Sequence, residues 1–155
     1  MKRMILTVAF VMSLAGGKLF AAGDERVSRQ AKETFKKEFP TAEFVKWQEI
    51  ENSGIYLARF LYDNQGFAAY FNEQGSLIAT ARQVTKENLP YKVSQVIGKK
   101  YSDGEILTIE ELTMDGTLSY FFTLEYEKTR TVLRVYHDGS VQKIKDERIK
   151  IIDKK

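Results

Sequence analysis

The sequence predicts an α+β fold: a tandem duplication of a helix plus a four-stranded antiparallel sheet, forming one continuous sheet with helices on one face. The first observation behind this prediction is that the chain matches itself at a nearly constant offset. Identical residues recur in pairs, namely Lys37 and Lys99, Glu43 and Glu105, Glu49 and Glu111, Gly54 and Gly116, Tyr56 and Tyr120, Tyr62 and Tyr126, Gly75 and Gly139, and Ser76 and Ser140. The second is that each half passes from helical spacing of apolar residues to two-residue alternation, which is typical of strands.

Each half opens with a predicted helix. In the first half an apolar residue recurs every fourth position, at Val27, Ala31, Phe35 and Phe39, and Pro40 ends the helix. In the second half Pro90 suits the start of a helix, and the apolar stripe consists of Val93, Val96, Ile97 and Tyr101.

Four strands follow each helix, separated by turns that are rich in Gly, Asn and Asp. The predicted strands cover residues 43–51, 55–62, 67–72 and 77–84 in the first half, and 105–113, 118–126, 131–137 and 141–149 in the second. Tight turns between consecutive strands predict antiparallel pairing, and residues 85–88 are the predicted linker.

The first 23 residues have the composition of a secretory signal peptide. Lys2 and Arg3 precede a short apolar run, and small residues lead up to the first acid, Asp24. Gly16, Gly17 and Lys18 interrupt the run before it reaches the length of a membrane span. We therefore expect a signal peptide at 1–23, repeats at 24–84 and 85–155 that together form one domain, no membrane span after signal removal, and a periplasmic or secreted location.

Charge and cysteine content exclude several classes of protein. The signal segment carries three of the 24 basic residues and no acid, so the mature chain has as many basic as acidic residues, 21 of each. A neutral chain lacks the net field that gathers phosphate backbones, so we expect no nucleic-acid partner. The chain contains no cysteine, which rules out disulfides, thiolate metal sites and a cysteine nucleophile.

No residue set predicts an enzyme. The single histidine, His137, precedes a predicted hairpin turn and lacks a nucleophile motif. Glu110 and Glu111 form a carboxylate pair, but strand pairs of this kind usually face solvent, and no loop has calcium-binding spacing. We predict no catalytic residue, no metal site and no cofactor.

Alternation along the strands assigns the side chains to two faces of the sheet. The face predicted to contact the helices carries Val45, Trp47, Ala58, Phe60, Ala69, Phe71, Leu77, Ala79, Leu107, Ile109, Phe122, Leu124, Leu133, Val135 and Val141. The opposite face is predicted to be more exposed and mixes arginines and tyrosines with apolar residues, a composition enriched at protein interfaces. The candidate partner-binding residues on it are Leu57, Arg59, Leu61, Tyr70, Phe121, Arg134 and Tyr136.

The chain also resembles the beta-lactamase-inhibitor-protein-like (BLIP-like), PepSY-like family of exported bacterial proteins. The resemblance covers nearly all of the mature chain and rests on Phe39–Pro40, Val45–Trp47, the strand at 56–60, the turn at 72–75 and Leu89–Pro90. It implies a concave sheet with the helices on its outer side and non-catalytic binding of an exported protein or peptidase. The chain departs from the disulfide-bearing inhibitor in having no cysteine, and beta-lactamase inhibition itself is not predicted.

Two hypotheses of function remain at this point. The first is an exported, inhibitor-like binding module that engages a protein through the open face of its sheet. The alternative is an envelope carrier of a small apolar ligand, which requires a closed apolar pocket between sheet and helices. The oligomeric state is left open.

Overall fold

The computed structural model describes residues 26–50 and 53–149. In this part of the chain one antiparallel sheet has eight strands, each paired with the next in sequence order. The strands are β1 (Glu43–Ile50), β2 (Ile55–Tyr62), β3 (Gln65–Asn72), β4 (Leu77–Gln83), β5 (Glu105–Met114), β6 (Thr117–Tyr126), β7 (Thr129–Tyr136) and β8 (Val141–Arg148). The predicted α+β class and continuous sheet are confirmed, whereas the predicted signal peptide at 1–23 lies outside the described residues.

Two α-helices accompany the sheet. Helix α1 (Arg29–Glu38) begins where the Ser28 hydroxyl accepts a hydrogen bond from the backbone N–H of Ala31, and it ends two residues before Pro40. Helix α2 (Tyr91–Lys100) begins directly after Pro90. The linker between the halves contains a short 3₁₀ turn, η2 (Lys86–Asn88).

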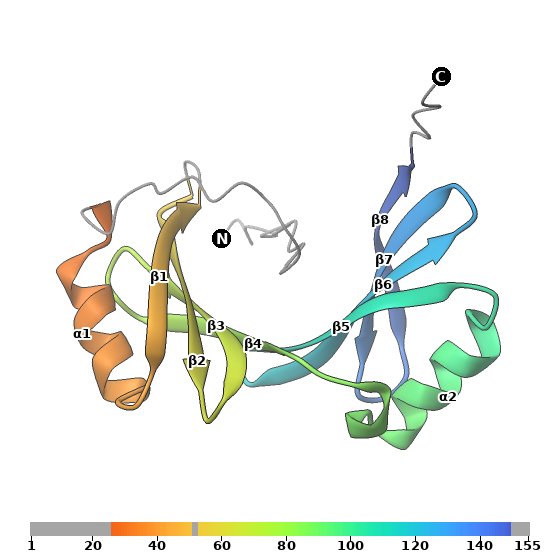
Figure 1. Ribbon diagram of the computed structural model, residues 1–155, viewed down its shortest axis with the longest axis horizontal. Coiled ribbons are helices and arrows are strands. Elements are labelled where there is room, and N and C mark those ends of the chain that lie inside the picture. Colours follow the sequence, from red (N-terminus) through yellow and green to blue (C-terminus); the bar gives the residue numbers. More distant parts are fainter. Residues whose placement is uncertain (1–25, 51–52, 150–155) are drawn as a thin grey trace, which may run out of the picture.

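The sheet is bent about its two central strands. Strands β1–β3 rise on one side of β4 and β5, and β6–β8 rise on the other, with α1 beside one arm and α2 beside the other (Figure 1). Strands β4 and β5 pair directly, so the two arms belong to one sheet without a gap. The inner side of the bend therefore extends over both halves of the chain.

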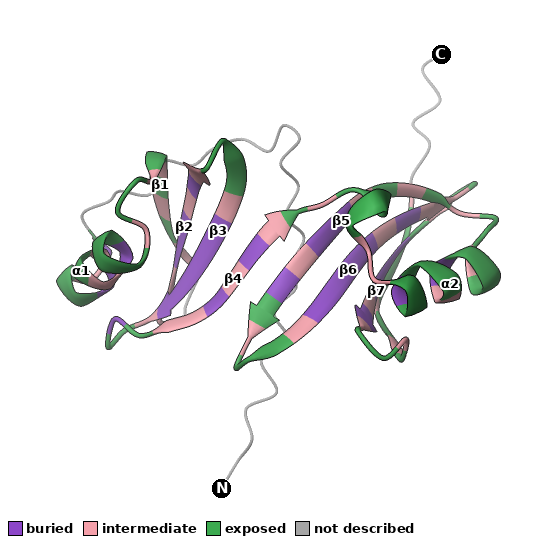
Figure 2. Ribbon diagram, turned by 90° about the horizontal axis from the view of Figure 1, so that it is seen from below, coloured by how far each residue is buried: buried purple, intermediate pink, exposed green. Residues whose placement is uncertain are grey.

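Three apolar clusters hold the structure together, and buried positions alternate along the strands with more exposed ones (Figure 2). The α1 cluster has the buried residues Val27, Ala31, Phe35, Ala58, Phe60, Ala69 and Phe71. The α2 cluster has Val93, Ile97, Ile109, Tyr120, Phe122, Leu124, Leu133 and Val135. The third, which we call the concave cluster, has Ile55, Leu57, Ala68, Tyr70, Ala79, Ala81, Leu112, Phe121 and Val132.

The single tryptophan packs with the first helix, as the sequence predicts. The ring centroid of Trp47 lies 5.3 Å from that of Phe35 on α1, in an edge-on arrangement that favours aromatic pairs. Phe35 also contacts Phe60 edge-on at 4.8 Å between ring centroids. Trp47 is therefore part of the core.

Two face assignments made from alternation are wrong, and in both cases the cause is a shift of strand register. Leu107 was predicted to contact α2 but is 39% exposed, because β5 and β6 lose register between Ile106 and Thr108 and Ile106 packs in the α2 cluster instead. Ala79 was predicted to lie towards α1 but belongs to the concave cluster. Tyr70 pairs with Ala79, while Phe71 pairs with Leu77, so the alternation slips by one residue there.

One hairpin glycine in each half lies close to a helix. Gly75, between β3 and β4, has φ +82°, and a Cβ added to it would come within 2.5 Å of the Gln30 Cβ on α1. Gly139, between β7 and β8, has φ +89°, and an added Cβ would come within 3.2 Å of the Val96 Cγ2 on α2. Glycine is required at both turns by the positive φ and by the close approach of the helix.

Candidate protein-binding face

The concave face, as we use the term, is the side of the sheet whose side chains point away from the residues that contact α1 and α2. Along β2, Leu57 belongs to the concave cluster whereas its neighbours Ala58 and Phe60 belong to the α1 cluster. Along β6, Phe121 belongs to the concave cluster and Phe122 to the α2 cluster. The concave face thus draws side chains from both halves of the chain.

Strand register places the candidate binding residues in rows that cross the sheet. One row of directly paired residues runs through Arg59, Ala68, Ala81, Leu112, Ser119 and Tyr136. A second row runs through Gln83, Glu110, Phe121, Arg134 and Gln142. Leu57 pairs with Tyr70, and Leu61 lies at the end of β2 opposite Gly66. All seven candidate residues therefore share the concave face.

Three of the seven are not exposed, and for them the prediction of an open face is wrong. Leu57, Tyr70 and Phe121 are 4%, 5% and 8% exposed. They pack in the concave cluster with the small residues between them, because side chains on the same face of neighbouring strands contact one another. Together with the rest of the concave cluster, these three residues form the floor of the face. The half-buried side chains are those of Arg59, Leu61, Arg134 and Tyr136.

Arg59 and Arg134 are both held by uncharged side chains. An Nη of Arg59 donates a hydrogen bond to Gln48 Oε1 at 3.0 Å. The Nε of Arg134 donates to the Ser119 hydroxyl at 3.1 Å, and the guanidinium carbon lies 4.7 Å from the ring centroid of Tyr136. Neither guanidinium forms an ion pair with a described residue.

Glu110 is a buried acid on this face that the sequence analysis placed in solvent. It is 5% exposed, and burial raises the pKa of its carboxyl from 4.5 to about 7, although the charge of Arg59 acts in the opposite direction. Its carboxylate makes no hydrogen bond or ion pair with a described residue. Burial also raises the pKa of the Tyr70 phenol. Alternation places Glu110 on the same face as Leu112, but it gives no signal that this face is buried there.

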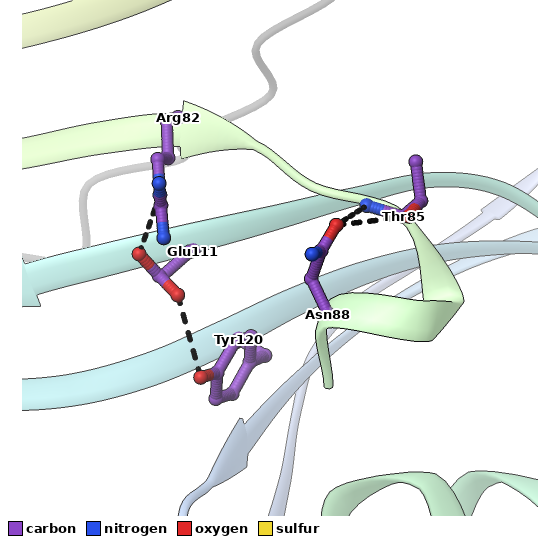
Figure 3. A network of polar contacts seen from close by, with 5 residues as sticks. All are labelled: Arg82, Thr85, Asn88, Glu111 and Tyr120. Carbon is purple, nitrogen blue, oxygen red and sulfur yellow. Dashed lines mark hydrogen bonds and ion pairs between the residues drawn. The ribbon is translucent and has the colours of Figure 1, made fainter. Parts of the chain in front are cut away.

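A polar network on the other side of β4 and β5 joins the two halves (Figure 3). The Nε of Arg82 on β4 donates to Glu111 Oε1 on β5 at 2.7 Å, and the Tyr120 hydroxyl lies 3.4 Å from Glu111 Oε2. Nearby, the Thr85 hydroxyl donates to Asn88 Oδ1 at 2.9 Å. This network fixes the strands on which the two arms of the concave face meet.

A small pocket lies at the same junction. It has a volume of about 200 Å³ and is lined by Phe67, Thr80, Ala81, Arg82, Glu111 and Thr113. Ligand sites are commonly about 300–1,000 Å³ and predominantly apolar. With an ion pair and two threonines in its wall, this pocket does not match the closed apolar cavity that a ligand carrier requires.

Metal-binding clusters and membrane-spanning helices are both absent from the described residues. No group of three or more His, Asp or Glu residues there is placed to hold a metal ion. None of the helices in residues 26–50 and 53–149 has the length and apolar character needed to cross a membrane.

Neither a protein-family model nor a curated protein matches the chain. Several solved structures share its fold, however. A BLIP-like protein from Bacteroides fragilis superposes with a TM-score of 0.68 at 19% identity, over 82% of this chain and 91% of that one. The chain has the BLIP-like fold.

Two further structures share the fold of this chain. A DUF2874 family protein from Bacteroides uniformis gives a TM-score of 0.70 at 18% identity, over 78% of this chain and 88% of that one. A protein from Bacteroides eggerthii that is inferred to be periplasmic gives 0.70 at 14% identity, over 79% and 88%. The resemblance predicted from the sequence is thus confirmed at the level of the fold, while its PepSY-like part stays a prediction.

Proposed function

We propose that this chain is a non-catalytic, exported, inhibitor-like binding protein that engages a protein partner through the concave face of its sheet. The observation that carries the proposal is the composition of that face. An apolar floor drawn from six strands is flanked by two half-buried arginines that form no ion pair with a described residue. Arginine and tyrosine around an apolar centre are the residues that dominate protein–protein binding energy.

The proposal includes the organisation of the chain. A signal peptide at 1–23 directs export to the periplasm or beyond, and repeats at 24–84 and 85–155, related by duplication, form one PepSY-like domain. The helix contacts of Gly75 and Gly139 support the duplication, because the same hairpin approaches the helix in each half. Placement of both helices on the outer side leaves the concave face to the partner, an exported protein or peptidase. The fold shared with the BLIP-like protein supports this assignment.

The absence of cysteine makes a sharp test possible, since one introduced cysteine carries one label. Lys46 on β1 and Thr117 on β6 are exposed positions on the concave face, one in each half. Lys36 on α1 and Lys100 on α2 are exposed control positions. Each variant (K46C, T117C, K36C, K100C) is exported, purified, labelled with a benzophenone maleimide and irradiated in an envelope extract of the source cells.

The proposal predicts that K46C and T117C crosslink to the same protein, that excess unlabelled protein suppresses this crosslink, and that K36C and K100C give none. Crosslinks that arise from the helix positions and not from the concave face would contradict it.

A further inference from the structure

We infer that the segment the concave face binds is acidic, with one carboxylate of the partner received by Arg59 and a second by Arg134. This inference rests on the proposed function and names the chemistry of the partner. The expected bound segment belongs to a protein and has an apolar centre and two acidic side chains, one directed to each arm of the sheet.

Each of the two arginines is half-buried and donates a hydrogen bond to a neutral group, Gln48 for Arg59 and Ser119 for Arg134. A partner that covers the face removes water from both charges, and a desolvated charge without a counter-charge strongly opposes binding. A partner carboxylate at each arginine removes that penalty.

Both arginines are already held in one orientation by contacts within the protein. The hydrogen bond from Arg134 to Ser119 and the contact with the Tyr136 ring fix the plane of its guanidinium. The hydrogen bond to Gln48 does the same for Arg59. Both groups retain N–H donors beyond the one in use, because a guanidinium has five. A guanidinium held in a fixed orientation can donate two parallel hydrogen bonds to the two oxygens of a carboxylate.

The two arginines lie on opposite sides of the floor of the concave face. Arg59 is on β2 and Arg134 on β7, and four strands separate them in the sheet. Between them lie the small and apolar residues of the concave cluster, including Ala68, Ala81 and Leu112. A segment that reaches both arginines must cross this floor, so an apolar side chain is expected between its acids.

Glu110 should make the affinity for an acidic segment depend on pH. The described groups that act on it are Arg59 from β2 and Tyr70 from β3, and its paired neighbours, Gln83 and Phe121, are uncharged. When Glu110 is ionised it competes with a partner carboxylate for the charge of Arg59. A carboxylate bound at Arg59 therefore favours protonated Glu110, and affinity for an acidic segment should fall as pH rises through 7.

The test is a selection of random twelve-residue peptides displayed on phage against the exported, purified protein. Enriched peptides are synthesised, and their affinities are measured for the unaltered protein, Arg59→Ala, Arg134→Ala and the control Lys99→Ala, which removes a charge from exposed α2. We expect enriched peptides with two acidic residues around an apolar one. Each concave substitution should weaken binding about tenfold or more, and Lys99→Ala should change it less than twofold.

Two further measurements separate charge recognition from a general effect on folding. Arg59→Lys keeps the charge and should recover part of the lost affinity. Between pH 6 and pH 8 the affinity of the unaltered protein should fall, and Glu110→Gln should remove most of that dependence.

The outcomes distinguish this inference from the proposed function. Neutral or basic peptides that bind the concave face, as mapped by crosslinking from K46C and T117C, would overturn the acidic partner and leave the concave face as the binding site. A selection whose peptides all map to α1 and α2, or that yields no peptide bound at the concave face, would contradict both.

Discussion

The Nε of Arg82 lies 2.7 Å from Glu111 Oε1, and this ion pair joins the last strand of the first half to the first strand of the second. Its partners are 37% and 18% exposed, so water screens the pair less than a fully exposed one. Because β4 and β5 make the junction between the arms, this contact adds to the backbone pairing that joins them.

Substitution of Glu111 by Gln should therefore weaken the junction. We expect a loss of about 1–2 kcal/mol in the free energy of unfolding, since a charge-assisted hydrogen bond to Arg82 is replaced by a neutral one. Urea unfolding measures the loss. Glu125→Gln is the matched control, because the pair of Arg130 with Glu125 is more exposed and lies within one half. An equal loss in the two variants would show that the junction pair has no special role.

Glu110 should make stability depend on pH. Its pKa is about 7 in the folded protein and 4.5 when unperturbed, so the unfolded chain releases its proton first as the pH rises. Stability associated with this group is full below pH 4.5 and is lost as pH rises to 7, by about 1–3 kcal/mol. Urea unfolding of the unaltered protein and of Glu110→Gln, at pH 5 and pH 8, should show a smaller pH effect in the variant. The exposed Glu105→Gln on the same strand is the control, and if it reduces the effect as much, Glu110 is not its source.

Gly75 and Gly116 offer a matched pair of hairpin glycines. Both have positive φ, but a Cβ at Gly116 has open space around it, whereas one at Gly75 meets Gln30 on α1. Gly116→Ala should cost about 1–2 kcal/mol through backbone strain alone. Gly75→Ala should cost at least twice as much, because α1 must also move. Thermal unfolding followed by circular dichroism compares the two, and similar midpoints would mean that the hairpin does not support α1.

The floor and the arginines of the concave face should respond differently to truncation. Leu57 is 4% exposed, so Leu57→Ala should lower stability by about 2–4 kcal/mol through loss of buried contacts. Arg59 is half-buried on the same strand, and Arg59→Ala should cost less than about 1 kcal/mol. Urea unfolding tests both. A loss for Arg59→Ala as large as that for Leu57→Ala would mean that Arg59 cannot serve as a clean probe of binding.

Much of the fold follows from local pattern. The turn glycines, the helical stripe ending before Pro40 and the alternation of the strands predict the eight strands to within a few residues at each end. Alternation fails where the strand register shifts, and it therefore put Leu107 and Ala79 on the wrong face. A β-bulge depends on the partner strand and leaves no local signal in the sequence.

The sequence predicted which residues lie on the concave face but not how deeply some of them are buried. Alternation placed Leu57, Tyr70 and Phe121 on one side of the sheet, as the structure has them, but it carries no information about how deeply they are buried. Glu110 was missed for the same reason. From the sequence alone, a carboxylate next to Glu111 is expected to be solvated, whereas Glu110 is buried.

The most direct test of the concave face is titration calorimetry with the partner protein that crosslinking identifies. The affinity of that partner is measured for three forms of this chain. These are the unaltered protein, the double variant Arg59→Ala with Arg134→Ala, and the control Lys99→Ala with Lys100→Ala, which removes the same charge from α2. The account predicts a loss of about a hundredfold for the first double variant and less than about threefold for the control. Equal affinity in all three forms would contradict it.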